Sequence, residues 1–183
     1  KSTDVVFCGN AISQRGRSTE VDVILQVGQL KKSVKVFGDR YWEKSFGVFN
    51  KSAPSPFNKI PLKYELAFGG LDTSNPDPAK HDSEKCNPVG IGFRAKKSQL
   101  PIDGSKLPNI ENPQKLISSP DDKPNPTGLG FVCPNWEPRV SFVGTYDDNW
   151  KKSRMPLLPK DFDCRFFNTA PPELVSDGFL KGD

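Results

Sequence analysis

The histidine at position 81, the only one in the chain, limits the catalytic chemistry that this sequence could support. Ser/His/Asp and Cys/His catalysis need a histidine as general base, so His81 would have to supply it. It lies in the hydrophilic segment TSNPDPAKHDSEK (73–85), which we expect to be an exposed loop. A histidine-based metal site would need further ligands. The sequence therefore predicts neither a catalytic histidine nor a metal site.

Carboxylates offer a second route to catalysis. Pairs occur at Asp121–Asp122 and Asp147–Asp148, and Asp161 lies close to Asp163. A glycosidase needs two carboxyl groups that face each other across a cleft, and adjacency in the sequence does not create that geometry. The first pair is typical of a turn, the second of a helix N-terminus, and Asp161 of a helix N-cap. A hydrolase of cell-wall or glycan material, using carboxylate pairs near 145–163, stays an alternative.

Cysteine spacing and glycine-rich motifs give no evidence for a cofactor. The cysteines at positions 8, 86, 133 and 164 are far apart and form no CxxC or CxxH pattern. Such spacing favours reduced thiols and a cytoplasmic location. Neither GxxxxGK[ST] nor a strand-linked GxGxxG is present. We expect no cofactor and no bound metal.

The charge pattern argues against nucleic acid and membrane as partners. The 26 basic and 22 acidic residues give a net charge of +4. The basic clusters are short, as at Lys31–Lys32, Lys96–Lys97 and Lys151–Lys152 with Arg154. None has the density expected of a nucleic-acid surface. No apolar run approaches the ~20 residues of a membrane span, and no signal peptide is evident.

A proline-rich region dominates the middle of the chain. Fourteen of the 18 prolines lie between Pro54 and Pro138, interleaved with aromatic and aliphatic residues that a disordered linker lacks. We therefore expect ordered loops anchored by buried aromatics. The length of 183 residues fits one domain, residues 1–183. Glycines 90, 92, 128 and 130 are expected to adopt positive φ so that Phe93 and Phe131 can pack.

Strand signals are strongest near the N-terminus. Alternating apolar residues predict a β-hairpin of residues 20–27 and 30–37. Further strands are predicted at residues 3–8, 61–68 and 139–145, whereas 71–86 reads as an exposed loop and 87–135 lacks periodicity.

Helical signals come late in the chain. Thr145 or Asp147 is expected to cap one short helix, and 161–168 to form another, with Phe162, Phe166 and Phe167 directed inward. The predicted fold is mainly β (α+β with few short helices), an antiparallel sheet or sandwich with long ordered loops.

Several phrases along the chain resemble one bacterial family. They are TDVVFCGNA (3–11), VFGDRYW (36–42), PFNKIPLKYELAFGG (56–70), NPVGIGF (87–93), LPNIENP (107–113), PTGLGF (126–131), NWEPRVSFVGTYDDNW (135–150) and PLLPKDFDCRFFNTAPPEL (156–174). Their order is similar to that of the domain-of-unknown-function family two-one-six-nine (DUF2169), which is encoded in type VI secretion clusters. The resemblance spans nearly all of the chain.

The resemblance implies a cytoplasmic, non-enzymatic adaptor. Members of this family look like accessory proteins that help to load effectors onto PAAR or VgrG spike proteins, and no catalytic residue can be carried over. Members also extend beyond the segments seen here, past a phrase that corresponds to 179–182. We therefore expect this sequence to be a central fragment of a longer protein.

The predicted partner is a protein, either an effector or a spike component. Exposed loop aromatics and charges would make the contact, and the candidates are Phe93, Trp136, Arg139 and Tyr146. For Trp136 a position in the core is the competing interpretation. A structural piece of a phage-tail-like assembly is a third possible function, beside the adaptor and the hydrolase.

Overall fold

The computed structural model describes residues 7–14, 17–131 and 136–169, and within these ranges the chain is mainly β, as predicted. The strands are β1 (Asn10–Ile12), β2 (Glu20–Val27), β3 (Leu30–Phe37), β4 (Trp42–Ser45), β5 (Val48–Lys51), β6 (Lys59–Pro61), β7 (Phe68–Gly69), β8 (Leu71–Asp72), β9 (Asp82–Ser83), β10 (Ile91–Gly92) and β11 (Ile110–Glu111). The helices are the 3-10 turns η2 (Tyr64–Leu66) and η3 (Pro78–Lys80) and the α-helices α1 (Glu137–Val140), α2 (Asp148–Ser153) and α3 (Arg165–Asn168).

The β2–β3 hairpin is the longest regular element among the described residues, and it confirms the period-two prediction. Its strands pair antiparallel from Glu20↔Phe37 to Val27↔Leu30, and Gly28 takes a φ of 57° in the connecting turn. Val34 and Val36 are buried, while Ile24 on the opposite face of the hairpin is exposed. One face of the hairpin therefore covers the core and the other faces solvent.

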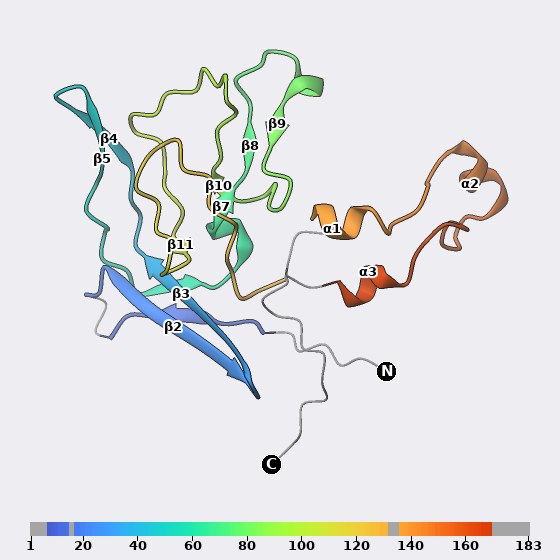
Figure 1. Cartoon of the computed structure of the whole chain (residues 1–183), viewed down its shortest axis with the longest axis horizontal. Helices are drawn as coiled ribbons and strands as arrows, with labels where there is room; N and C mark the ends of the chain where they lie inside the picture. Colours follow the sequence, from blue (N-terminus) through green and yellow to red (C-terminus); the bar gives the residue numbers. More distant parts are fainter. Residues whose placement is uncertain (1–6, 15–16, 132–135, 170–183) are drawn as a thin grey trace.

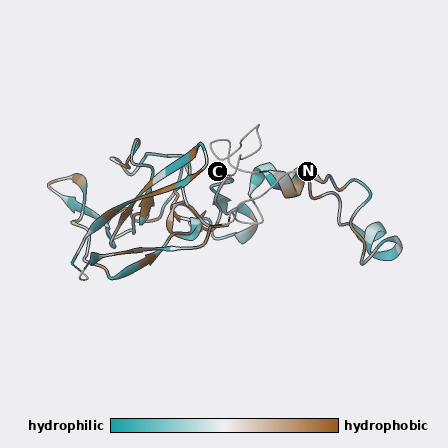
Figure 2. Cartoon of the chain, turned by 90° about the horizontal axis from the view of Figure 1, so that it is seen from below, coloured by the Kyte–Doolittle hydropathy of each residue, from teal (hydrophilic) through white to brown (hydrophobic). Residues whose placement is uncertain are grey.

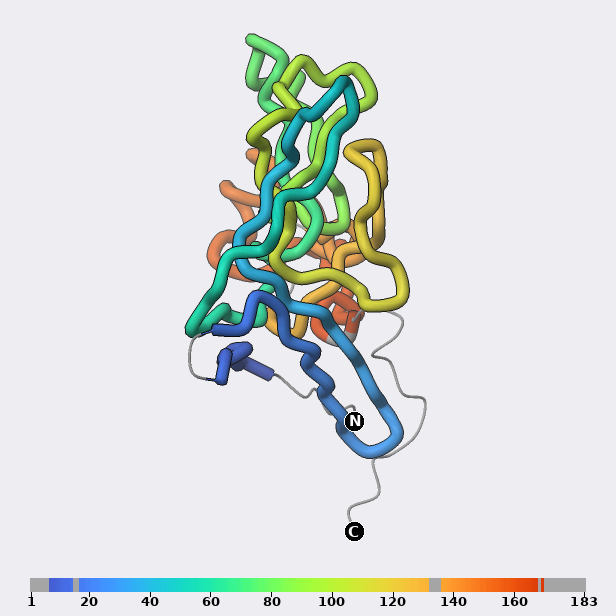
Figure 3. The backbone as a smooth tube through the Cα atoms, turned by 90° about the vertical axis from the view of Figure 1, so that its left-hand side faces the viewer, coloured from blue at the N-terminus to red at the C-terminus, as the bar shows by residue number. Residues whose placement is uncertain are grey.

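The remaining strands form small sheets. β11 joins the hairpin to give the order β11-β3-β2, and β1–β6, β4–β5 and β8–β9 form antiparallel pairs. The pair β7–β10 is parallel, which departs from the antiparallel expectation. Figure 3 shows the β4–β5 hairpin and the β2–β3 hairpin directed toward opposite ends of this part of the chain.

Buried apolar side chains of the described residues form two clusters. The first lies under the β2–β3 hairpin and includes Ala11, Val34, Val36, Phe57, Ile60, Leu62, Ala67, Ile110 and Leu129. The second consists of Trp42, Phe68, Phe93, Leu107 and Ile117. Many of these side chains come from the proline-rich region, so the predicted ordered loops with buried aromatics are present.

Buried polar side chains hold these loops in place. Asn87 donates from Nδ2 to the carbonyl oxygens of Tyr64 at 2.7 Å and Phe68 at 2.9 Å. Asp72 accepts from the amides of Ser74 at 2.9 Å and Ala95 at 2.8 Å. Because such bonds satisfy backbone groups that have no strand partner, they replace the long ladders of a larger sheet.

Two predicted strands are wrong. Within 61–68 the chain turns through η2, because the bond from Asn87 and the bond from the Ala67 amide to the Tyr64 carbonyl (3.0 Å) stabilise a tight turn. Within 139–145 the chain begins in α1, since a proline is favoured in the first turn of a helix. Gly144, with a φ of 78°, then interrupts the extended conformation.

Other predictions need smaller corrections. The segment 71–86 is not a plain loop, because it contains β8, η3 and β9. Of the predicted strand at 3–8, the described residues Phe7 and Cys8 are not in a strand, and 3–6 lie outside the described ranges. Gly92 has a φ of 94° and Phe93 is buried, as expected, but Phe131 is exposed and the other three glycines lack positive φ.

The described chain divides visibly into a compact part and an extension. We call residues 7–131 the body and residues 136–169 the arm. Figure 1 shows the arm leading away from the body through α1 to α2 and returning to α3. Figure 2, turned by 90°, shows the same separation. Within the described residues no helix is both long and apolar enough to cross a membrane.

Candidate protein-interaction site

The arm consists of two chain segments that run side by side and are tied together. The Asp163 amide donates to the Phe142 carbonyl at 3.0 Å. Asp161 accepts from the amide of Thr145 at 3.0 Å and from its hydroxyl at 2.7 Å. These bonds from Thr145 lower the pKa of the Asp161 carboxyl, so the tie is charged near neutral pH. The outgoing and returning segments are therefore fixed to each other.

Helix α2 lies at the far end of the arm. Asp147 caps it, as predicted, by accepting from the Trp150 amide at 2.7 Å. The Trp150 indole donates to the Leu157 carbonyl at 2.8 Å and meets the Tyr146 ring edge-on at a centroid distance of 4.6 Å. Arg154 donates through Nε to the Leu158 carbonyl at 3.0 Å. The turn after α2 is thus anchored by side chains of the helix.

Exposed apolar side chains gather around this anchored turn. Met155 and Leu157 are 64% and 63% exposed, and Tyr146 and Leu158 are nearly half exposed. We call these four residues the apolar tip. Since Trp150 and Arg154 hold the carbonyls of Leu157 and Leu158, and the Tyr146 ring packs on Trp150, these side chains are presented in a defined arrangement. A patch of apolar side chains on the surface, rimmed by polar residues, is typical of a site that binds another macromolecule.

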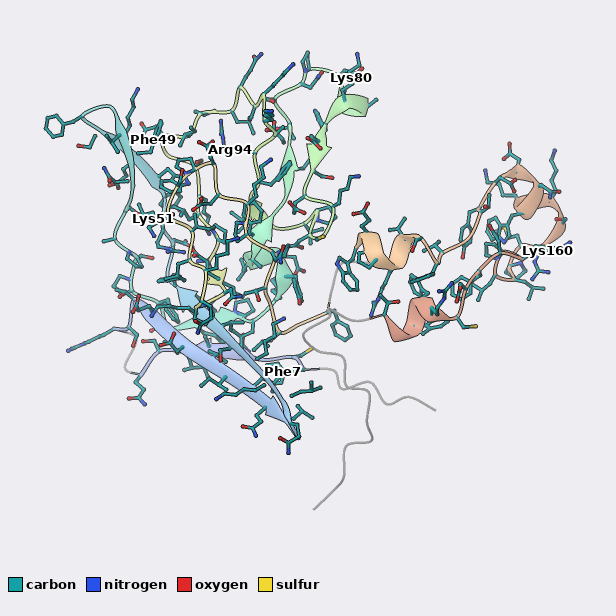
Figure 4. All side chains as sticks on the ribbon, in the orientation of Figure 1. Phe7, Phe49, Lys51, Lys80, Arg94 and Lys160 are labelled. Carbon is teal, nitrogen blue, oxygen red and sulfur yellow. The ribbon has the colours of Figure 1, made fainter. Side chains whose placement is uncertain are left out.

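Beside the apolar tip, the acidic side chains are bonded within the arm, whereas two lysines are not paired with a described acidic residue. The carboxylates of Asp147 and Asp161 bind amides of the arm itself, and Lys151 pairs with Asp148 at 3.1 Å. Lys152 and Lys160 are exposed, and neither forms an ion pair with a described residue. Figure 4 shows Lys160 at the far end of the arm. The rim of the tip therefore carries available positive charge.

The base of the arm is built from aromatic and arginine side chains. Trp136 is buried, and the Arg139 guanidinium lies 5.9 Å from its ring and 5.8 Å from that of Phe166. Arg139 also donates to the Thr169 carbonyl, at 3.2 Å from Nε and 3.0 Å from Nη2. These contacts hold α1 beside α3.

A short contact joins the arm to the body. The Glu137 amide donates to the Lys85 carbonyl at 3.2 Å, and the Glu137 carboxylate lies 3.6 Å from the Lys85 ammonium group. A shallow, open hollow lies beside this contact, lined by Ser83, Lys85, Pro88, Glu137 and Val140. Two of its polar side chains, Lys85 and Glu137, are the pair that joins the arm to the body.

The structure does not bring the four predicted binding residues together. Trp136 and Phe93 are buried, so neither is the exposed aromatic that was expected; Phe93 packs with Trp42 and Leu107 in the body. Arg139 is partly buried at the base of the arm. Tyr146 alone among the four belongs to the apolar tip. Whether these residues bind a partner stays a prediction.

Sequence reasoning missed Met155, Leu157 and Leu158. The available signal was the run MPLLP (155–159), which is apolar and lies between the basic segment KKSR and Lys160.

Helix α3 is shorter than the expected 161–168, and Phe167 is exposed rather than directed inward. Asp161 is not an N-cap, since it binds Thr145 instead. Pro171–Pro172 and Cys133 lie outside the described residues.

Several of the residues weighed for catalysis have structural partners. His81 is half-buried, and its Nε2 lies 2.9 Å from the Asn75 carbonyl oxygen. Asp122 accepts from the Ser118 and Ser119 amides at 2.8 and 2.9 Å. Across the described part of the chain, no group of three or more His, Cys, Asp and Glu residues is arranged to hold a metal ion. Cys8, Cys86 and Cys164 are free and exposed.

Comparison with known proteins identifies one family. The family described as "Uncharacterized protein conserved in bacteria (DUF2169)" matches residues 1–183. Searches of curated proteins and of solved structures return no match.

Proposed function

Because the chain belongs to the DUF2169 family of uncharacterized bacterial proteins, we propose that it is a non-enzymatic adaptor that binds another protein. In this proposal it acts in the cytoplasm as an accessory protein of a type VI secretion system. Its partner is a secreted effector or a spike component of the VgrG or PAAR type. The resemblance of the phrases along the chain supports the assignment to a type VI secretion system. The exposed apolar residues of the arm support a role in binding another protein.

The apolar tip is the observation that carries this proposal. Burying a leucine or methionine side chain stabilises a protein by about 1.5–3 kcal/mol. Because Met155, Leu157 and Leu158 stay in water, they do not contribute this stabilisation to the fold. Yet the arm fixes their backbone with specific hydrogen bonds. A fixed, exposed apolar cluster with cationic neighbours fits a partner that has an apolar surface with an acidic rim.

The use of the carboxylates supports an adaptor over a hydrolase. A hydrolase needs one carboxyl group free to protonate a leaving group and a second that faces it. In the arm, Asp147 caps α2, Asp161 binds Thr145 and Asp163 pairs with Arg165. Asp148 pairs with Lys151, so each of these four carboxylates is bonded to a backbone amide or a side chain of a nearby residue.

An affinity experiment in the producing bacterium tests the proposal. Tagged full-length protein is compared with Leu157→Asp and with Leu71→Asp as a matched control, because Leu71 is similarly exposed but lies on β8 of the body. Wild type and the control should recover an effector or spike protein, and Leu157→Asp should lose it. Recovery of no such protein, or equal recovery by all three, would count against the proposal.

Size-exclusion chromatography addresses the third function. An adaptor should elute as a discrete species. Stable rings or fibres of the purified full-length protein would favour a structural role in a tail-like assembly.

A further inference from the structure

The β4–β5 hairpin carries a second exposed apolar feature, far from the arm. Ser45 pairs with Val48, so Phe46 and Gly47 form the two-residue turn. Phe46 has a φ of 48° and Gly47 a φ of 83°, as in a type I′ turn. Phe46 is 105% exposed, so no part of the chain that the structure describes covers its side chain, and Val48 beside it is also exposed.

Phenylalanine is a costly choice for this position. Among non-glycine residues described in the structure, Phe46 is the one with positive φ. Type I′ turns strongly prefer Asn-Gly, because asparagine tolerates the left-handed conformation and a bulky side chain does not. A buried ring could offset such a cost by packing, but this ring is in solvent. Among the described residues, the hairpin therefore gains no packing from an aromatic at its tip.

The hairpin that carries Phe46 is firmly attached to the body. Trp42 is buried, its amide donates to the Ser105 carbonyl at 2.9 Å, and its own carbonyl accepts from Gly104 at 2.7 Å. The Lys44 amide donates to Asp103 Oδ1 at 2.7 Å, and Lys51 Nζ donates to the Ile117 carbonyl at 2.6 Å. Figure 4 shows Phe49 and Lys51 along this projecting hairpin. A ring on such a support is preorganised for binding.

We propose that Phe46 is an anchor that inserts into an apolar pocket of a partner protein, with Val48 packing at the rim of that pocket. Aromatic side chains that fill a desolvated pocket of the partner are typical of interface hot spots. This contact is separate from the apolar tip and does not depend on the partner's being a secretion component.

The local charges favour a protein pocket over a lipid surface. Anionic membranes attract clusters of about four to eight lysines and arginines. Around Phe46 the cation of Lys44 is accompanied by the carboxylates of Glu43 and Asp103, all on the same hairpin and its neighbouring segment. This mixture gives no net attraction to an anionic bilayer, whereas it suits a polar rim of mixed charge around a pocket.

Site-specific photocrosslinking tests the proposal in the producing bacterium with the full-length protein. A benzophenone-bearing phenylalanine analogue replaces Phe46 in one variant and the exposed Asn50 on β5 in a control. A protein joined at position 46 but not at position 50 is identified by mass spectrometry and then purified. Its affinity is measured for wild type, Phe46→Asn and Leu157→Asp. Sedimentation with vesicles of phosphatidylcholine and phosphatidylglycerol provides the lipid comparison.

The expected result is one protein joined at position 46, through a peptide rich in apolar residues. Phe46→Asn should weaken its binding by about 30-fold, the loss typical of a truncated hot spot, without lowering the urea midpoint. Absence of a product at position 46, equal products at both positions, unchanged affinity of Phe46→Asn, or Phe46-dependent vesicle binding would each overturn the proposal. If only Leu157→Asp weakens binding, the arm's role is supported and the proposal for Phe46 fails. If only Phe46→Asn weakens binding, the proposal for Phe46 is supported and the arm's role in binding this protein fails.

Discussion

The guanidinium of Arg40 and the carboxylate of Glu111 form an ion pair in the interior of the body, with side chains only 4% and 2% exposed. Arg40 also donates to the Pro108 carbonyl at 2.8 Å and stacks 3.6 Å from the Phe37 ring centroid. Glu111 accepts from the Ile117 amide at 2.7 Å. The pair thus connects the end of β3 and the start of β4 to the loop that follows β11.

Breaking this pair should destabilise the chain strongly. Glu111→Gln leaves the Arg40 charge buried without its counterion, which costs about 3–5 kcal/mol. The double variant Arg40→Met with Glu111→Leu removes both charges and should recover most of that loss. Urea unfolding of the full chain measures the free energy of unfolding of wild type and of both variants. A Glu111→Gln variant as stable as wild type would show that the pair contributes little.

Acid should weaken the turn that Asp72 holds. Burial raises the pKa of this carboxyl, but hydrogen bonds from Ser74, Ser98 and Ala95 outweigh burial and keep the pKa well below its usual range. The stabilisation from Asp72 is therefore complete above the unfolded pKa of about 3.9 and is lost as pH falls toward the folded value.

The Asp72→Asn variant tests this linkage. At neutral pH it should be less stable than wild type by about 1–3 kcal/mol, because an acceptor for buried amides is lost. The difference should shrink as pH falls below about 4, because Asp72 takes up a proton in the unfolded chain at a higher pH than in the folded protein. Denaturant midpoints measured across this range decide the matter, and a difference independent of pH would contradict the assignment.

Gly69 should tolerate no side chain. Its φ is 147°, and a Cβ built on it would lie 2.1 Å from the Asn87 carbonyl oxygen. That oxygen accepts from the amides of Gly70 and Gly90, so it cannot move freely. Gly69→Ala should cost at least about 2 kcal/mol more than Gly104→Ala, whose site also has positive φ but is open. Thermal unfolding of the two variants makes the comparison.

Removing the cap of α2 should loosen the arm without affecting the body. Asp147→Ala leaves the Trp150 amide without its acceptor, at a cost of about 1 kcal/mol to the helix. Amide hydrogen exchange should accelerate in 148–153 and stay unchanged in the β2–β3 hairpin. Asp148→Ala removes only the exposed ion pair with Lys151. It should therefore accelerate amide exchange in 148–153 less than Asp147→Ala does.

Phe46→Asn should stabilise the isolated protein. Asparagine adopts positive φ at lower cost than phenylalanine, and the lost ring buries nothing, so a gain of about 1 kcal/mol is expected. Val48→Asn, also exposed but with ordinary strand geometry, should give no such gain. Urea unfolding distinguishes the two. A less stable Phe46→Asn variant would show that the ring packs on the chain.

The parts of the fold that the sequence predicted are those with strong local signals. The β2–β3 hairpin has clean alternation on both strands, and Asp147 is a preferred N-cap residue directly before α2. The strand pairs β7–β10 and β8–β9 span two residues each, too short for any periodicity. The segments 61–68 and 139–145 alternate as a strand would, but tertiary hydrogen bonds from Asn87 and the helical preference of Pro138 outweigh that pattern.

The candidate site was less predictable than the fold. Trp136 and Phe93 attract attention as aromatics in loops, yet burial cannot be read from residue type, and both lie in apolar surroundings. The exposure of Leu157 and Leu158 depends on the arm's projecting from the body, which no local pattern encodes. For Phe46 a signal existed, since Phe-Gly stands where a tight turn favours Asn-Gly.

The contact between Arg139 and Thr169 places the beginning and the end of the arm next to each other. The length of chain between them is consequently not dictated by the body. Insertions, deletions or exchanges within 142–163 should therefore leave the two ends of the arm in register and the body unchanged.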